Sequence, residues 1–199
     1  MKIYIYGASG HGLVVADIAK VCGYSDIILI DDGNNPYPSF NDIREDRTTP
    51  IALGIGDNRV RETLFNRVIE SGFKVISLVH RSAVIGSGVE IGRGVVIMPN
   101  VVVNAKAKIG NGVILNSGSI IEHESIIDDF AHISPNVALA GNVKVGRATQ
   151  IGIGSSVIQG LSIGNFCMVG AGSVVVESIP SFTLSYGNPC RVIRSIDNE

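Results

Sequence analysis

The clearest chemical signal in the sequence is a histidine between two acidic residues, in the segment Glu122-His123-Glu124. A carboxylate next to an imidazole fixes the tautomer of the ring and raises its basicity, as a general base requires. No similar combination recurs in the surrounding repeats described below. We therefore predict that His123 is a catalytic base assisted by Glu124. The alternative is a solvated polar corner without chemistry.

A glycine-rich turn, Gly7-Ala8-Ser9-Gly10-His11-Gly12, forms a second candidate site. Free N–H groups at the start of a helix favour an anion such as a phosphate. Asp31-Asp32 follows about 20 residues later, where an acidic side chain can bind a sugar. The glycine order G-x-x-G-x-G differs from the dinucleotide fingerprint, so the turn predicts a nucleotide-sugar site. The alternative is a tight turn without a ligand.

The elements around this turn predict a small α/β domain over residues 1–78. Strands are expected at 3–6, 27–30, 50–55 and 73–78, and helices at 13–21 and 58–71. Alternating strands and helices indicate a parallel sheet covered by helices, here a Rossmann-like unit. On the second helix Val60 is expected on the buried side.

From residue 85 to 175 every sixth residue is aliphatic. The positions are Ile85, Ile91, Ile97, Val103, Ile109, Leu115, Ile121, Ile127, Ile133, Leu139, Val145, Ile151, Val157, Ile163, Val169 and Val175. A period of six fits neither an amphipathic helix nor a single half-buried strand. It fits a parallel β-helix whose repeats bury their side chains by stacking. We assign this domain to residues 79–178.

The pattern resembles the hexapeptide-repeat acyltransferases, which wind a left-handed parallel β-helix with three hexads per coil. That resemblance implies about five coils over the repeat. Gly141 is one coil after His123, so its N–H would lie beside the imidazole, where an oxyanion needs a donor. His132 is half a coil from His123 and would point to the opposite side. Both histidines serve one site only if it lies between subunits, so we predict a homotrimer.

Composition limits the other possibilities. The 199 residues carry a net charge of −2 and no long basic run, which argues against nucleic acid as a partner. The three cysteines, Cys22, Cys167 and Cys190, predict neither a disulfide framework nor a zinc site, and Cys167 falls in an inward slot. We expect a cytoplasmic protein without a signal peptide or membrane span.

The period breaks at Ile179-Pro180, and a tail is predicted over residues 179–199. Its Gly187-Asn188-Pro189-Cys190-Arg191 segment resembles the tail that caps the solenoid near coenzyme A in the same superfamily. Arg191 and Arg194 are then candidates for the phosphates of the cofactor. Alternatively they pair with carboxylates of the protein.

The combination of the N-terminal turn, the acidic pair and the histidine on a solenoid resembles PglD-type nucleotide-sugar N-acetyltransferases, with the sialic-acid O-acetyltransferases as close relatives. The stretches 2–12, 103–108 and 140–144 are most similar to enzymes that act on UDP-4-amino-4,6-dideoxy-N-acetylglucosamine in bacillosamine synthesis. The resemblance covers the whole chain. It implies acetyl-CoA as co-substrate and no metal.

The resemblance also implies roles for individual residues. His123 is the base and Glu124 raises its basicity. Residues implied to hold the UDP-sugar are Ser9, Gly10, His11, Asp31, Asp32, Gly56 and Asn116. Residues implied to contact acetyl-CoA are His132, Gly141, Ile153, Gly170, Ala171 and Arg191.

Two positions depart from the family pattern. Asp57 stands where an uncharged Asn is expected, and Ala171 replaces a glycine. Three alternatives remain open at this stage: a sugar O-acetyltransferase, an N-acetyltransferase for a GDP- or dTDP-linked amino-sugar, and a scaffold without catalysis. A scaffold has no need of a base, which argues against the last.

Overall fold

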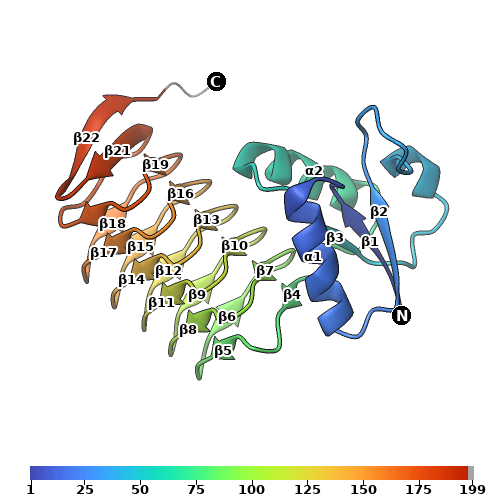
Figure 1. The fold of residues 1–199 in the computed structure, drawn as a ribbon, viewed down its shortest axis with the longest axis horizontal. Helices are drawn as coiled ribbons and strands as arrows, with labels where there is room; N and C mark the ends of the chain where they lie inside the picture. Colours follow the sequence, from blue (N-terminus) through green and yellow to red (C-terminus); the bar gives the residue numbers. More distant parts are fainter. Residues whose placement is uncertain (197–199) are drawn as a thin grey trace.

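The computed structural model describes residues 1–196 as a small α/β domain followed by a parallel β-solenoid (Figure 1). The N-terminal elements are β1 Lys2–Tyr6, α1 Gly10–Val21, β2 Asp26–Ile30, the 3-10 helix η1 Phe40–Ile43, β3 Ile51–Leu53 and α2 Asn58–Glu70. The three strands form a parallel sheet in the order β2-β1-β3. The predicted Rossmann-like alternation is confirmed for these elements.

The fourth strand predicted at residues 73–78 forms only in part. Val75 makes a single parallel bridge to Ile51 of β3, where Ile51 N–H donates to Lys74 O and Ile76 N–H donates to Ile51 O. From Leu78 on, the backbone pairs with the solenoid: Leu78 N–H donates to Val95 O in the next coil, 2.9 Å away, and β4 (Leu78–Val79) pairs with a solenoid strand. The segment therefore passes from the small sheet into the solenoid, which begins near residue 78.

Three glycines let the start of α1 pack against β3. A Cβ on Gly12 would lie 1.9 Å from the Gly7 carbonyl oxygen, and one on Gly54 would lie 2.7 Å from the Gly12 Cα. Gly7 itself has a positive φ of 113°. No larger side chain fits at these positions, so these glycines have a structural role that does not depend on a ligand.

The solenoid is built from two-residue strands at the predicted positions. Their bounds are β4 Leu78–Val79, β5 Val84–Ile85, β6 Glu90–Ile91, β7 Val96–Ile97, β8 Val102–Val103, β9 Lys108–Ile109, β10 Ile114–Leu115, β11 Ile120–Ile121, β12 Ile126–Ile127, β13 His132–Ile133, β14 Ala138–Leu139, β15 Lys144–Val145, β16 Gln150–Ile151, β17 Ser156–Val157, β18 Ser162–Ile163, β19 Met168–Val169 and β20 Val174–Val175.

These strands stack into three parallel sheets, which we name by what their outward surfaces carry. The domain face contains β4, β7, β10, β13, β16 and β19; the apolar face contains β5, β8, β11, β14, β17 and β20; and the charged face contains β6, β9, β12, β15 and β18. Partners in neighbouring strands are eighteen residues apart, as Ile114 with His132 and Ile120 with Ala138 show. The seventeen strands β4–β20, at three per coil, make roughly six turns, whereas the expected five counted only the span from residue 85 to 175.

The aliphatic slots point inward and form a narrow core. All of them are buried from Ile97 onward, whereas Ile85 and Ile91 in the first coil are 38% and 37% exposed. Hydroxyl side chains in the small slots, such as Ser155 and Thr149, are fully buried because each bonds a carbonyl of the next coil. These repeats thus bury their apolar side chains and pair their hydroxyl groups through the neighbouring coil.

The three outward surfaces differ. On the domain face Val96 and Ile114 are buried, and α1 lies against β4 (Figure 1). The apolar face exposes Val84 and Ile120, at 59% and 38%. The charged face carries charged side chains at Glu90, Lys108 and Lys144.

The tail closes the last coil as a hairpin. β21 (Thr183–Gly187) pairs in parallel with β19, and β22 (Cys190–Ser195) pairs antiparallel with β21. This hairpin falls within the tail predicted at residues 179–199, of which residues 197–199 lie outside the described residues. Cys167 is buried as expected, and the three cysteines are free. None of the helices in residues 1–196 has the length and apolarity to cross a membrane.

Candidate active site

His123 lies on the turn that joins the apolar face to the charged face. Its Nδ1 is 3.2 Å from Glu124 Oε2, and the two side chains are 60% and 58% exposed. Glu124 adopts a left-handed φ of 60°, which the turn repeats at the same place in other coils. Because Nδ1 faces the carboxylate, Nε2 is the ring nitrogen left to accept a proton.

Gly141 lies directly next to this imidazole, one coil further along. A Cβ on Gly141 would be 2.6 Å from both Nε2 and Cε1 of His123. The predicted stacking of these two residues is confirmed, and only glycine leaves room for the ring. Within residues 1–196 the Gly141 N–H donates to no backbone acceptor, whereas its carbonyl accepts from Gly160 N–H. The free N–H is a candidate oxyanion donor beside the base.

His132 lies on the opposite side of the solenoid, as the coil geometry predicts. It belongs to β13 on the domain face and is only 8% exposed. Its Nε2 is 3.1 Å from the Asn116 amide nitrogen, and its ring centroid is 6.3 Å from that of His11 on α1. The structure therefore brings His11, Asn116 and His132 of one chain together, away from His123.

This histidine pair is uncharged at neutral pH. Burial lowers the pKa of His132 to about 3, and the charges of Arg61 and His11 add to this while the Gly56 carbonyl opposes it. Burial also lowers the pKa of His11 to about 4, with Arg61 acting in the same direction. His132 Nδ1 and His11 Nε2 are buried, and neither has a hydrogen-bond partner within ordinary hydrogen-bond geometry.

Arg61 is a functional candidate that the sequence reasoning missed. It is fully buried on α2, whereas Val60, which we expected inside, is 48% exposed. The signal was present, since Arg61, Phe65 and Val68 have helical i, i+4, i+7 spacing and all three are buried. Arginine is rarely fully buried, so its presence at a buried helical position is easily overlooked in the sequence.

In the N-terminal turn the glycines separate into two kinds. A Cβ on Gly10 or on Gly56 would meet no atom within 4 Å, unlike Gly7 and Gly12. Ser9 and Gly10 are exposed at the N-terminus of α1. Open space beside these glycines suits the close approach of a ligand.

The two acidic residues at the end of β2 are used differently from the expectation that both face a nucleotide. Asp31 accepts from Ala8 N–H at 2.9 Å and from Gly33 N–H at 2.8 Å, which links the turn to the following loop and lowers the pKa of Asp31. Asp32 accepts from Phe40 N–H through one oxygen and from Tyr6 and Arg67 through the other. Both oxygens of Asp32 therefore have internal partners.

Asp57, the first departure from the family pattern, has a local explanation. Its Oδ1 accepts from Val60 N–H at 2.9 Å and caps the N-terminus of α2. A carboxylate stabilises this helix end through the hydrogen bond and the helix dipole. Asp57 thus needs no ligand to account for it.

The remaining predicted residues lie along the edge between the domain face and the apolar face. Ile153 and Ala171 are exposed on turns of this edge, while a Cβ on Gly170 would be 2.7 Å from Tyr186 of β21. Arg191 lies in the exposed hairpin, 3.8 Å from Glu177. This edge and the His123 corner border the apolar face on its two sides.

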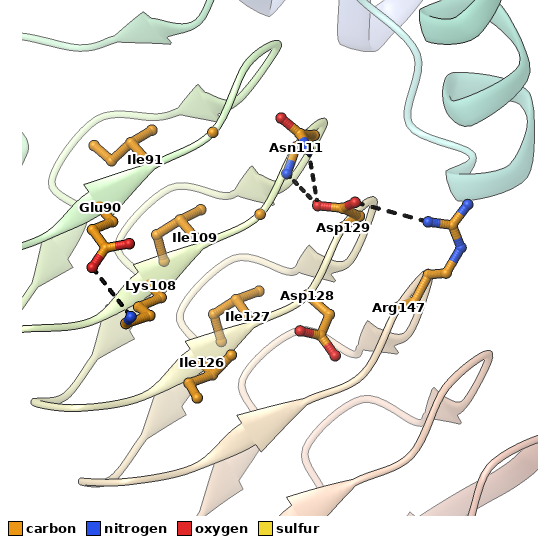
Figure 2. A pocket seen from close by; sticks show the side chains of 12 residues that line it. Glu90, Ile91, Lys108, Ile109, Asn111, Ile126, Ile127, Asp128, Asp129 and Arg147 are labelled. Atoms are coloured by element: carbon orange, nitrogen blue, oxygen red, sulfur yellow. Dashed lines mark hydrogen bonds and ion pairs between the residues drawn. The ribbon is translucent and has the colours of Figure 1, made fainter.

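A groove of about 560 Å³ lies elsewhere, on the charged face (Figure 2). An ion pair between Glu90 and Lys108 closes one end, and Asp129 bonds Asn111 and lies 3.9 Å from Arg147 at the other. It contains none of the predicted site residues. Residues 1–196 hold no group of three or more side chains suited to a metal.

Comparison with known proteins agrees with this architecture. Residues 2–68 match the PglD N-terminal domain family. The acetyltransferase domain of PglB from Neisseria gonorrhoeae, also solved with acetyl coenzyme A, is 33% identical, with a TM-score of 0.90 over 96% of this chain and 99% of that domain. PerB from Caulobacter crescentus in complex with CoA and GDP-perosamine is 32% identical, with a TM-score of 0.93 over 98% of both chains.

Matches to curated sequences are shorter. A Staphylococcus aureus (strain MRSA252) protein, provisionally named an acetyltransferase, is 42% identical over 71 residues, which is 36% of each chain. Because the solved relatives match over nearly their whole length, the family is established: the chain belongs to the PglD-type acetyl-CoA-dependent nucleotide-sugar N-acetyltransferases, within the hexapeptide-repeat superfamily.

Proposed function

We propose that this protein transfers the acetyl group of acetyl-CoA to the C4 amine of a UDP-4-amino-4,6-dideoxy-N-acetylglucosamine-type sugar. The observation that carries the proposal is His123 next to Gly141, where one ring nitrogen faces Glu124 and the other faces the glycine. A base beside a free N–H is the pair of groups that acyl transfer requires. The family relationship supports a nucleotide amino-sugar as acceptor.

The mechanism follows from these groups. The sugar amine must lose a proton to attack the thioester, and His123 Nε2 accepts that proton as the N–C bond forms. The carbonyl oxygen becomes negative in the tetrahedral intermediate, and the Gly141 N–H stabilises it. The C–S bond then breaks, the amide forms, and the coenzyme A thiolate is protonated by the imidazolium of His123. Glu124 stabilises the imidazolium between the two steps.

We assign the nucleotide to the open part of the N-terminal turn. Ser9, Gly10 and Gly56 provide backbone without steric obstruction, and the N-terminus of α1 favours a diphosphate. His11 and Asn116 then lie beyond the turn, where the sugar would follow. His132, which the resemblance assigns to acetyl-CoA, lies with them, so we place it where the sugar amine meets the acetyl group. The solenoid edge with Ile153, Gly170 and Ala171, and Arg191 in the hairpin, would receive acetyl-CoA.

A homotrimer would complete this site. The apolar face exposes aliphatic side chains and is bordered on one side by the His123 corner and on the other by the edge next to Asn116. Packing three apolar faces around an axis would bury those side chains. It would also bring the His123 corner of one chain beside the cluster of His11, Asn116 and His132 in the next. The three free cysteines suit the cytoplasmic location that we also propose.

A substrate panel tests this function. Purified protein is supplied with acetyl-CoA and with UDP-, GDP- and dTDP-linked 4-amino-sugars, each paired with its 4-hydroxy analogue, and free coenzyme A is measured. We expect the highest kcat/KM with the UDP-amino-sugar. Preference for a GDP- or dTDP-linked amine would overturn the nucleotide assignment, and faster turnover of a hydroxyl analogue would overturn N-acetylation.

A further inference from the structure

Arg61 is a buried cation that has no ion-pair partner in the described chain. Its guanidinium donates to uncharged oxygens alone: the carbonyls of Ile55, Gly56, Gly112 and Phe130 and the side chain of Asn58. Its side chain is fully buried. A buried charge without a carboxylate costs more stability than a well-packed apolar side chain of similar volume. The cost suggests that the charge of Arg61 has a use.

The hydrogen bonds of Arg61 connect the loop that carries Gly56 to the solenoid turns next to His132. On one side Nε and one terminal nitrogen bond Gly112 O and Phe130 O, both at 2.7 Å, on the turns that lead into β10 and β13. On the other side the second terminal nitrogen bonds Gly56 O at 2.9 Å. The planar fork therefore fixes the distance between the loop that carries Gly56 and the strand that carries His132.

The charge of Arg61 also acts on the histidine pair. The charged and titratable groups around the pair are Arg61 on α2, Asp57 just before α2, and the two imidazoles themselves, on α1 and β13. A fixed positive charge in a dry environment opposes a second one nearby. An uncharged imidazole can accept a hydrogen bond from an amine, whereas a protonated one can only donate.

We propose that Arg61 is a positioning residue for the acceptor sugar: its guanidinium holds the Gly56 loop at a fixed separation from the turns that precede β10 and β13, and so sets the positions of Gly56 and His132 relative to each other. Its fixed charge beside the two imidazoles is the second part of this role. This assignment rests on the proposed acetyl transfer to a nucleotide amino-sugar.

Two substitutions separate the geometry from the charge. Arg61→Met removes both, and Arg61→Lys keeps the charge but loses the fork. Arg147→Met is the matched control, because Arg147 also joins α2 to the solenoid, through Glu62 and Asp129, without contacting Gly56 or either histidine. The full-length variants are compared by thermal unfolding, by KM for each substrate and by NMR titration of the histidine side chains.

In Arg61→Met we expect KM for the nucleotide amino-sugar to rise roughly tenfold to hundredfold, with a much smaller change in KM for acetyl-CoA. The titration midpoints of His11 and His132 should rise by about one pH unit or more. In Arg61→Lys the midpoints should stay low while KM for the sugar still rises. Arg147→Met should change neither the sugar KM nor the midpoints.

The proposal is overturned if the histidine midpoints of Arg61→Met equal those of the wild type, or if Arg61→Met and Arg147→Met lose stability and activity alike with no selective effect on the sugar. If Arg61→Met does not fold, Arg61→Lys decides: a wild-type KM for the sugar contradicts the positioning role. If wild-type protein acetylates no nucleotide amino-sugar, the proposed function fails. The NMR titration would still show whether the charge of Arg61 lowers the pKa of the two histidines.

Discussion

At the scale of single residues, the candidate chemistry depends on close contacts around glycines. His123 is an exposed side chain, so its own burial does little to orient it. Its position is set by Glu124 on one side and by the missing side chain of Gly141 on the other. An exposed ion pair alone contributes little energy, which makes the glycine the more restrictive of the two.

Gly141→Ala tests this restriction. The added methyl would lie 2.6 Å from the His123 ring and displace the base, so kcat should fall by roughly 10²- to 10⁴-fold, as expected for loss of a general base. KM for both substrates should change little. Ala105 holds the corresponding place one coil before His123, and Ala105→Gly is the control, with wild-type kcat expected. Wild-type turnover of Gly141→Ala, measured by coenzyme A release, would contradict the assigned base.

The buried histidines predict a pH dependence of stability. In the folded state the pKa of His132 is about 3 and that of His11 about 4, below the unfolded value of about 6.5. The unfolded chain therefore binds more protons between pH 6.5 and 4, and stability falls as pH decreases through that window. The free energy of unfolding in urea should decrease less between pH 7 and 5 in His132→Gln than in the wild type. Equal decreases would show that His132 is not buried in the neutral form.

At the scale of elements, the N-terminal turn combines a structural and a binding part. Gly7 and Gly12 let α1 approach β3, while Gly10 faces open space. Asp31 ties the turn to the loop, and Asp32 anchors η1 through Phe40. These roles predict different outcomes for substitutions that are close together in the sequence.

Gly10→Val should raise KM for the sugar nucleotide about tenfold or more, since the new side chain occupies the ligand's approach to the helix N-terminus. KM for acetyl-CoA and the melting temperature should stay near wild type because nothing in the chain obstructs the added atoms. Asp32→Ala should instead lower the melting temperature, since Tyr6 and Arg67 lose their common acceptor. Equal effects of Gly10→Val on the two KM values would place the sugar nucleotide elsewhere.

At the scale of the whole molecule, the two histidines are on opposite sides of one solenoid, so one chain has two half-sites. Mixed trimers test whether they combine. Chains carrying His123→Ala are mixed with chains carrying His132→Ala, both inactive alone, and subunits are allowed to exchange. Interfaces that carry both wild-type histidines should restore part of the activity.

The control for this experiment is each variant exchanged with itself, which should stay inactive. A monomeric mass by light scattering, or no recovered activity after exchange is demonstrated by mass spectrometry of tagged chains, would exclude a shared site. Recovered activity below that of the wild type is expected because only some of the mixed interfaces carry both histidines.

Much of the solenoid could be predicted because its period is local and repetitive. Each aliphatic slot recurs after six residues, and the family resemblance implies three such hexads per coil. With that coil length, the stacking of His123 on Gly141 and the opposite position of His132 follow from counting along the chain. The Gly-rich turn and its flanking elements were also readable, because a strand and a helix leave strong local patterns.

Tertiary structure alone decided what depends on contacts across the chain. The segment 73–78 looks like one strand, but it bridges β3 only at Val75, and Leu78 pairs with the next coil. Asp32 looks like a ligand acceptor, yet Tyr6, Phe40 and Arg67 occupy both of its oxygens. Arg61 looks like a surface cation, and only the packing of α2 on the solenoid buries it against five oxygens. Sequence patterns record the preference of a residue for water or for a core; which buried partner satisfies a polar group is fixed only when distant segments meet.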